Sequence, residues 1–259
     1  MNEVRVAGQQ SVRRACDVLF CLEAEDGALT AAEVAARLGM NRTTAWRYLQ
    51  TLAGVGLARE VDSGRFALGA RAVSLAESWS RQWGELLAVA AGPLVQLRDA
   101  VGETAALHVR QGWSRVVIRQ VESRHELHRT YRDMGRPIPL HVGAPSLAIL
   151  AALAPAEQRE YLTSHAGADE SSRRELEEQL ATVRHRGWAL SRGARVPDVA
   201  SVAVPLREPS GRVLGAINVT GPQERVLAAD PGQLAEAIGV AVSAVERRLA
   251  EVAPGPRRA

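Results

Sequence analysis

Four polar or basic side chains and one aromatic lie within one short stretch of the chain: Arg42, Thr43, Trp46, Arg47 and Gln50. Separations of one and three residues place them on the same side of a helix. Arg and Gln can each form a pair of hydrogen bonds with a purine edge, Arg with guanine and Gln with adenine. A helix with such a face fits the DNA major groove, so the chemistry open to these residues is base recognition.

The surrounding residues carry the signals of two helices joined by a tight turn. Thr30 and Glu33 have the spacing of a capping box, which satisfies backbone N–H groups at a helix start. Gly39 suits the left-handed conformation that ends a helix, and Asn41 is a preferred cap for the next one. The buried side of that second helix is expected to contain Ala45, Tyr48, Leu49, Leu52 and Val55. This order of signals predicts a helix-turn-helix.

The flanking residues extend this motif to a winged helix. Ser11 can cap an earlier helix. The apolar positions of that helix are Val12, Ala15, Leu19 and Leu22. Downstream, Leu57–Val61 and Arg65–Leu68 flank the turn residues Asp62-Ser63-Gly64, which predicts a hairpin. Arg59 and Arg65 would lie on this wing, within reach of phosphates or a minor groove.

A less specific interpretation is a helical hairpin in an enzyme core with a solvated basic face. We favour DNA binding because the capping box, glycine turn, polar face and wing occur together and in order. The residues expected to contact double-stranded DNA are Ser11, Asn41, Arg42, Thr43, Thr44, Trp46, Arg47, Gln50, Arg59 and Arg65.

Length and composition bound the rest. The chain has 259 residues, enough for two domains, and a formal net charge of +3. We find no hydrophobic run that could span a membrane and no signal peptide, so we expect a cytoplasmic protein without membrane contacts. Cys16 and Cys21 both lie on the first helix and are interpreted as a reduced pair in the protein core. Every basic residue is Arg, which we attribute to codon usage in a GC-rich genome.

A linker helix is predicted between the wing and the rest of the chain. Its apolar stripe contains Ala72, Leu75, Ala76, Trp79 and Trp83. Such a stripe must be buried against something, either its own domain or a second copy of the chain. We favour a dimer seam.

From residue 85 onward the pattern is mixed α and β. The expected strands are Thr104–Val109, Arg115–Val121, Leu127–Tyr131, Ser201–Leu206 and Arg212–Thr220. The expected helices are 85–100, 143–153, Ala156–Thr163, Ser172–Arg186 and one opened by Pro231. We expect an α+β fold in which helices flank an antiparallel sheet. The predicted division is a DNA-binding domain over 9–69, a linker helix over 70–84, a second domain over 85–252 and a disordered tail over 253–259.

Over nearly its whole length the sequence resembles the IclR-type bacterial transcriptional regulators. The matching segments include Ser11-Val-Arg-Arg-Ala15, Asn41-Arg-Thr-Thr44, Gly135-Arg-Pro137, Arg186-Gly-Trp-Ala189 and Gly221-Pro222. The resemblance implies a winged helix-turn-helix, a linker helix and a GAF-like domain that binds a small effector. It also implies homodimers or homotetramers on palindromic operators.

The resemblance also places an effector site, with departures from the family pattern. Ser146 stands where the family has glycine, and Leu147 stands where it has lysine. The expected effector-binding residues are Ala144, Pro145, Ser146, Ser191, Arg192, Ser201, Asn218 and Thr220. Period 2 puts Asn218 and Thr220 on one strand face, where a polar ligand, the backbone or water could be their partner. The effector is expected to be a small organic acid; an apolar aromatic effector and a domain used only for oligomerisation stay open.

Catalytic chemistry is weakly supported by the sequence. Ser146 lacks the glycine two residues later that a nucleophile elbow requires, and we find no P-loop or dinucleotide fingerprint. His125 and His128 lie near Glu122 and Glu126, but positions three apart on a strand face opposite sides. We therefore expect no enzyme activity, no cofactor and no metal. An enzyme built on the GAF-like domain would need convergent acid and base residues.

Overall fold

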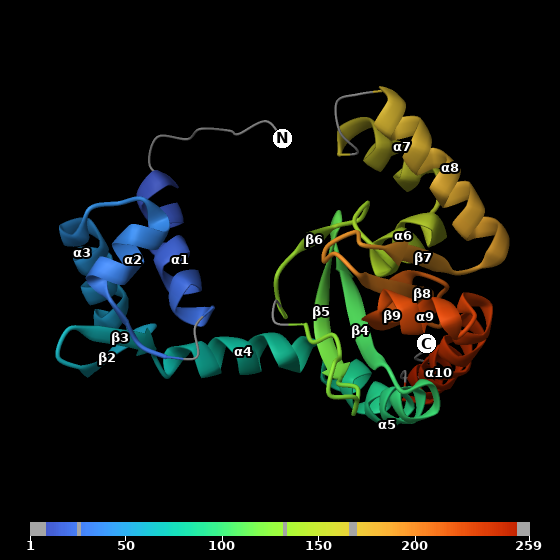
Figure 1. The fold of residues 1–259 in the computed structure, drawn as a ribbon, viewed down its shortest axis with the longest axis horizontal. Coiled ribbons are helices and arrows are strands. Elements are labelled where there is room, and N and C mark those ends of the chain that lie inside the picture. The colour runs from blue at the N-terminus through green and yellow to red at the C-terminus, as the bar shows by residue number, and fades with distance from the viewer. Residues whose placement is uncertain (1–8, 25–26, 132–133, 166–169, 253–259) are drawn as a thin grey trace, which may run out of the picture. The chain divides into compact units, whose positions relative to one another are not determined.

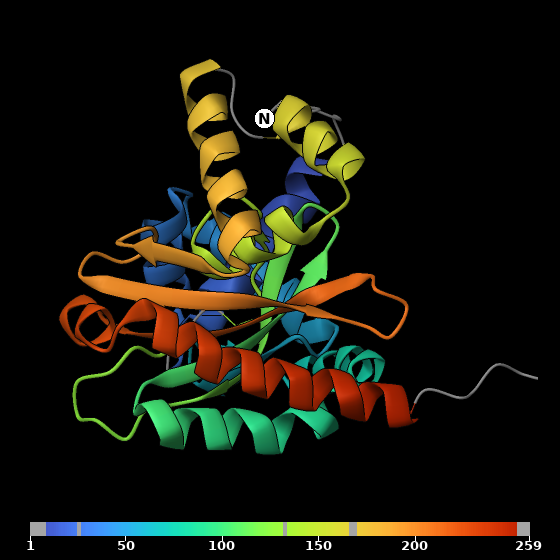
Figure 2. The ribbon, with the colours of Figure 1, turned by 90° about the vertical axis from the view of Figure 1, so that its right-hand side faces the viewer.

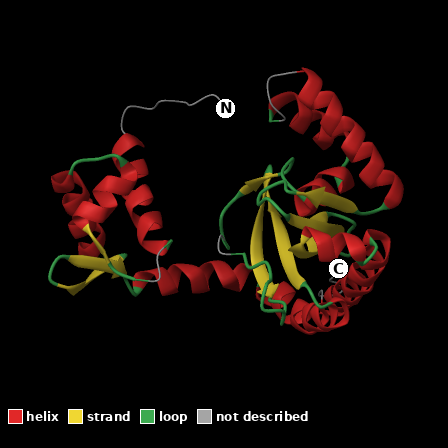
Figure 3. Ribbon diagram, in the orientation of Figure 1, coloured by secondary structure: helices red, strands yellow, loops and turns green. Residues whose placement is uncertain are grey.

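A computed structural model of the protein describes residues 9–24, 27–131, 134–165 and 170–252. The chain divides into two compact units, Met1–Trp83 and Gly84–Ala259, called the first and second unit below. Figure 3 shows helices and strands in both. The predicted disordered tail, 253–259, lies outside the described residues.

The first unit is a winged helix-turn-helix followed by one further helix (Figure 1). Its elements are α1 (Gln9–Glu23), β1 (Leu29–Thr30), α2 (Ala31–Leu38), α3 (Arg42–Gly54), β2 (Ala58–Asp62), β3 (Arg65–Leu68) and α4 (Arg71–Gln82). The three strands form an antiparallel sheet in the order β1-β3-β2.

Local signals produce the turn between α2 and α3 as predicted. The Thr30 hydroxyl accepts from the Glu33 N–H at 3.2 Å, and the Glu33 carboxylate accepts from the Thr30 N–H at 2.7 Å. Gly39 ends α2 with φ of 60°, and the Asn41 side chain accepts from the Thr44 N–H at 2.7 Å. The predicted capping box, glycine turn and cap are therefore confirmed.

The residues of α1 that are buried in the core of the first unit differ from those predicted. The buried side of α1 contains Val18 and Leu22, whereas Val12 is 64% exposed. Ser11 lies inside α1, which begins at Gln9, so it is not the cap. Cys16 is exposed and Cys21 half-buried, so the pair is not in the core. The register of α1 is set by packing on α2, α3 and β3, which the α1 sequence alone does not reveal.

Near its C-terminal end α3 also departs from expectation. Ala45, Leu49 and Leu52 are buried as predicted, but Val55 is 53% exposed because it follows the last helical residue. A residue beyond the end of the helix no longer follows its period, which explains this difference.

The second unit contains one six-stranded antiparallel sheet, as the α+β prediction required. Its strands are β4 (Thr104–Gln111), β5 (Ser114–Val121), β6 (Ile138–Pro139), β7 (Ala189–Arg192), β8 (Val199–Arg207) and β9 (Val213–Pro222), in the order β6-β5-β4-β9-β8-β7. Its helices are α5 (Gly84–Val101), α6 (Ala144–Ala152), α7 (Pro155–Ser164), α8 (Glu170–Arg186), α9 (Gln223–Ala228) and α10 (Pro231–Val252). Figure 2 shows α5 and α10 side by side along one face of the sheet and α6 on the other.

The predicted strand Leu127–Tyr131 is wrong. This segment is a loop, and the Gln120 side chain takes the place of a strand partner at its end. The Tyr131 N–H donates to Gln120 Oε1 at 2.8 Å, and Gln120 Nε2 donates to the Tyr131 carbonyl at 3.3 Å. A side-chain amide thus satisfies the backbone groups that a neighbouring strand would otherwise pair. The short elements β1, β6, β7 and α9 were not predicted.

One face of the six-stranded sheet carries a row of polar residues. Register pairs Thr104 with Thr220, and Thr220 with Ser201, across β4, β9 and β8. Ser201 pairs in turn with Ser191 on β7. Side chains at paired positions share a face, so four strands present polar groups to the side that α6 covers.

Candidate DNA-binding face and effector pocket

The exposed side of α3 presents the side chains that sequence analysis selected for base recognition. Arg42, Thr43 and Arg47 are exposed, and Trp46 is 50% exposed. Gln50 is half-buried. The opposite side of α3 is fixed by Ala45 and Leu49, which are fully buried. A rigid helix therefore displays long polar side chains to solvent, as a major-groove reader requires.

The remaining predicted DNA contacts have different roles in the first unit. Asn41 is exposed, but its side-chain oxygen caps α3 by accepting a hydrogen bond from the Thr44 N–H. Thr44 itself is half-buried. Ser11 is exposed on α1, and Arg59 is exposed on β2.

Arg65 connects the wing to α2 and to the residue before β1 through polar contacts. Its guanidinium donates to the Ala28 carbonyl at 2.5 Å and lies 3.8 Å from the Glu33 carboxylate. The pKa of Glu33 is lowered, mainly by its hydrogen bonds with Thr30 and also by Arg65. Arg65 is thus a structural residue of the wing whatever its contact with DNA.

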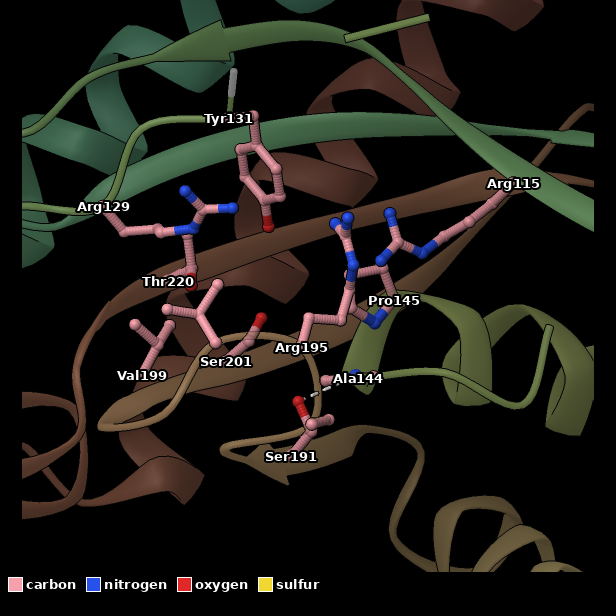
Figure 4. A pocket seen from close by; sticks show the side chains of 13 residues that line it. Arg115, Arg129, Tyr131, Ala144, Pro145, Ser191, Arg195, Val199, Ser201 and Thr220 are labelled. Carbon is pink, nitrogen blue, oxygen red and sulfur yellow. Dashed lines mark hydrogen bonds between the residues drawn. The ribbon is translucent and has the colours of Figure 1, made fainter. Parts of the chain in front are cut away.

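In the second unit a pocket opens between α6, the polar sheet face and two loops (Figure 4). Its volume is about 380 Å³, open mouth included. The pocket is lined by Arg115, Arg129, Tyr131, Gly143, Ala144, Pro145, Ser191, Ala194, Arg195, Val196, Val199, Ser201 and Thr220. Three of these residues are arginines, and none of the described lining residues is acidic. The lining is therefore strongly positive.

The structure brings five of the predicted effector-binding residues to this lining: Ala144, Pro145, Ser191, Ser201 and Thr220. The other three lie elsewhere. Ser146 and Asn218 are fully buried behind the lining, and Arg192 is exposed at the end of β7, outside the set of described lining residues.

A continuous hydrogen-bonded chain runs behind the pocket from Arg115 to Tyr131. Arg115 Nη1 lies 2.7 Å from His108 Nδ1, and His108 Nε2 lies 2.8 Å from Asn218 Oδ1. Asn218 Nδ2 donates to the Tyr131 hydroxyl at 2.9 Å and to Ser201 Oγ at 2.7 Å. We call these four residues, Arg115, His108, Asn218 and Tyr131, the relay. Asn218, a predicted ligand contact, therefore finds its partners within the protein.

Burial holds the relay in one charge state. His108 is fully buried, and desolvation lowers its pKa well below the usual 6.5, with a further contribution from the positive charge of Arg115. A neutral imidazole has one donor and one acceptor nitrogen. It can therefore accept from Arg115 and donate to Asn218 at the same time.

Arg115 is held by a residue at the start of α6 in addition to His108. Its Nε donates to Ser146 Oγ at 2.8 Å, which explains why a hydroxyl residue stands at that position. Gly143 precedes α6 with φ of 84°, a conformation that glycine adopts without strain. The Ala144 N–H donates to Ser191 Oγ at 2.9 Å, and Pro145 has no N–H. The backbone at the start of α6 is thus largely satisfied, so guanidinium groups are the main anion donors of the pocket.

Sequence analysis missed Arg115, Arg129 and Tyr131. Arg129 and Tyr131 lie on the loop that we expected to be a strand. The Thr104 hydroxyl holds this loop by donating to the Arg129 carbonyl at 2.7 Å. Arg225 donates to the Leu127 carbonyl at 2.8 Å while it pairs with Glu103. These are long-range contacts, for which a single sequence has no signal.

Arg115 had a usable signal. It is the first residue of the predicted strand Arg115–Val121, and in the structure it lies two positions before Val117, the β5 residue that pairs with His108 on β4. A charged residue directly before the apolar run Val116–Ile118 is unusual enough to merit attention.

The described residues offer neither a metal site nor a membrane-spanning helix. His, Cys, Asp and Glu side chains do not gather there in groups of three or more that could hold a metal ion. None of the helices in this part of the chain is long and apolar enough to cross a membrane.

Comparison with known proteins identifies the two units. Residues 11–62 match the IclR helix-turn-helix domain, and residues 82–247 match the family described as bacterial transcriptional regulator IclR C-terminal. The chain belongs to the IclR family. It is a DNA-binding transcriptional regulator, and its relatives are regulators rather than enzymes.

Several IclR-family proteins match over most of the chain. The HTH-type transcriptional regulator BhcR of Paracoccus denitrificans is 31% identical over 242 residues, 89% of this chain and 84% of BhcR. The transcriptional repressor IclR of Escherichia coli is 27% identical over 84% of this chain and 81% of its own length. The crystal structure of Thermotoga maritima IclR shares the fold, with a TM-score of 0.72, 20% identity and coverage of 93% of this chain and 99% of that one.

Proposed function

We propose that this IclR-family regulator binds an inverted-repeat operator as a dimer and that a small organic acid in the pocket changes its operator affinity. The observation that carries the effector proposal is the lining: three guanidinium groups and no carboxylate among the described lining residues. Guanidinium groups pair with carboxylates through two parallel hydrogen bonds. An acid is therefore the class of small molecule that this pocket fits best.

A structural neighbour supports this choice of ligand class. An IclR homologue from Microbacterium hydrocarbonoxydans was crystallised with 4-hydroxybenzoate; it has a TM-score of 0.71 and 21% identity, and covers 93% of this chain and 100% of that one. That compound is an organic acid, the ligand class that the arginines of this pocket favour. The likeness supports an acid effector without identifying it.

The dimer proposal rests on α4. None of its described residues is buried within the chain, and Leu75 is 57% exposed. Trp79 and Trp83 lie together, with ring centroids 6.3 Å apart. Two helix-turn-helix units related by a two-fold axis would read half-sites about one helical turn apart. The apolar side of α4 is our candidate for the seam between them.

Effector action requires different affinities in two arrangements of the protein. A ligand shifts an equilibrium only by the difference in its affinity for the two states. In this chain α4 and α5 follow each other with Trp83 between them. We propose that acid binding in the second unit changes how the two DNA-binding units of the dimer are presented.

Calorimetry on the full chain tests the pocket. A panel of small organic acids and neutral aromatics is titrated into wild type, Arg195→Gln and Arg192→Gln. Arg195 lines the pocket, whereas Arg192 is three residues earlier and exposed outside it, so the two variants lose the same charge in different places. We expect an acid to bind wild type and Arg192→Gln, and to bind Arg195→Gln at least tenfold more weakly.

Three other outcomes would count against the proposal. An equal loss of acid affinity in both variants would mean that the net charge of the protein, and not a contact in the pocket, attracts the acid. Tight binding of a neutral aromatic alone would favour the apolar pocket. Binding by none of the compounds would favour a second unit that serves only for oligomerisation.

A further inference from the structure

We propose that the pocket is specific for a short dicarboxylate and that Tyr131 is the residue that selects it, by donating a hydrogen bond to the second carboxylate. This inference rests on the proposed organic-acid site. It names the chemistry of the acid and a specificity-determining residue that the sequence did not indicate.

The direction of every hydrogen bond in the relay follows from Arg115. A guanidinium has only donors, so His108 Nδ1 must accept from it. A neutral His108 then has its proton on Nε2 and donates to Asn218, which makes the facing atom of Asn218 its oxygen. The remaining NH₂ group of Asn218 can only donate, and it donates to the Tyr131 hydroxyl and to Ser201. The relay therefore has one polarity.

Because every hydrogen bond in the relay runs in one direction, the Tyr131 hydroxyl can donate its own proton to a further acceptor. Its hydroxyl oxygen already accepts from Asn218, so its proton points to another acceptor. The hydrogen bonds of the described residues provide none for it, whereas the Ser201 hydroxyl donates to the Val219 carbonyl at 3.1 Å. Tyr131 is only 6% exposed and lines the pocket. A buried donor aimed into a pocket is satisfied by an acceptor on the ligand.

The cations lie on both sides of this donor. Figure 4 shows Arg129 on one side of the Tyr131 ring and Arg115 and Arg195 on the other, towards the start of α6. The Arg129 guanidinium lies 5.2 Å from the centre of the Tyr131 ring. One carboxylate placed beside Arg115 and Arg195 leaves the second cationic end, with Tyr131, for another anionic oxygen. A ligand with two carboxylates matches both ends.

A monocarboxylate of the same length would place a methyl group at Tyr131. The buried hydroxyl proton would then lose its acceptor, and sites built around such a hydrogen bond discriminate strongly against ligands that lack it. We therefore expect the second carboxylate to raise affinity at least tenfold.

Matched pairs of acids test the proposal on the full chain by calorimetry. The probes are malonate with propionate, succinate with butyrate, and glutarate with pentanoate, so each pair differs only in the second carboxylate. In wild type we expect at least one dicarboxylate to bind tenfold or more tightly than its partner. Tyr131→Phe should reduce that ratio to less than threefold while it leaves the affinity for the monocarboxylate unchanged.

Asn218→Asp tests the relay with a nearly isosteric change. An aspartate at 218 can only accept, so Tyr131 would donate to it instead of to the ligand. The dicarboxylate should again lose its advantage. In a Tyr131→Phe background the same substitution should cost the dicarboxylate less than it does in wild type, because only the repulsion of the added charge remains. Thermal unfolding of each variant verifies that the second unit is folded.

The outcomes separate this inference from the proposed function. If acids bind but each pair binds equally, the dicarboxylate proposal is wrong and the acid site stands. A dicarboxylate preference that survives in Tyr131→Phe would overturn the role of Tyr131. If none of the six acids and none of the wider acid panel binds, both proposals fall.

Discussion

The recognition side of α3 and the pocket of the second unit use polar residues in opposite ways. Arg42, Arg47 and Trp46 extend into solvent from a helix that is fixed only by its buried side. Behind the pocket lining, His108 and Asn218 are fully buried and hydrogen-bonded to each other and to their neighbours. The first arrangement leaves side chains able to adapt to a DNA surface, whereas the second fits the proposed role of a pre-organised site for one small ligand. The substitutions below should therefore affect one region and spare the other.

The largest effect is expected at α4. Replacing both Trp79 and Trp83 with Ser should produce monomers and abolish operator binding, because one half-site alone supplies only half of the contacts. Light scattering and operator binding measure the two effects. Acid binding in the second unit should persist. A double variant that keeps the mass of wild type would argue against the seam.

On α3, Arg47→Ala should weaken specific operator binding by about 1–3 kcal/mol if the side chain reads a base edge. Acid binding should be unchanged. The matched control is Arg59→Ala on the wing, which removes the same charge and should weaken operator and scrambled DNA alike. Competition binding with both DNAs provides the test, and an equal loss on both DNAs in Arg47→Ala would show that Arg47 contacts only the backbone.

Acid pH should destabilise the second unit selectively. The buried His108, with Arg115, Arg195, Tyr131 and Asn218 around it, stays neutral when folded but takes a proton below pH 6.5 when unfolded. Its folded pKa is lowered, so the stability is present above pH 6.5 and is lost as pH falls, by about 1.4 kcal/mol per pH unit for one proton. Burial also lowers the pKa of His141, which adds to the loss.

Denaturant unfolding at pH 7.5, 6.5 and 5.5 measures this loss. All six histidines lie beyond residue 83, so the first unit should lack this contribution. His108→Gln should make the pH dependence of the second unit shallower. The same slope in wild type and His108→Gln would mean that another group takes up the proton.

The smallest effect is expected at the cap of α3. Asn41→Ala removes the hydrogen bond to the Thr44 N–H and should cost the first unit about 1 kcal/mol of unfolding free energy. Thr43→Ala, an exposed change two residues later, is the control and should cost less. Chemical denaturation followed by circular dichroism measures both. A cost in Asn41→Ala no greater than in Thr43→Ala would show that the cap contributes nothing measurable.

The two regions also differ in how far the sequence predicted them. The capping box at Thr30 and Glu33, the turn at Gly39 and the cap at Asn41 depend on residues within four positions of each other, so a local reading was sufficient. In the pocket, Arg115, Arg129 and Arg195 come from separate segments that only the folded sheet and its loops bring together.

The strand period placed Asn218 and Thr220 on the sheet face that meets the pocket. It could not show that Asn218 is buried behind Tyr131, because Tyr131 reaches the site through a loop that Gln120 holds with its side chain. Side-chain hydrogen bonds between distant residues leave no periodic signal in the sequence.

Operator affinity of the full chain, with and without a saturating acid that calorimetry has identified, tests the account most directly. The operator is the inverted repeat protected in footprinting. We predict that the acid changes operator Kd about 5-fold to 150-fold in wild type, the usual range of allosteric coupling, and equally in Arg192→Gln. At the same acid concentration Arg195→Gln should respond much less while it keeps the acid-free Kd of wild type. An acid that occupies the pocket yet leaves the wild-type operator Kd unchanged would contradict the account.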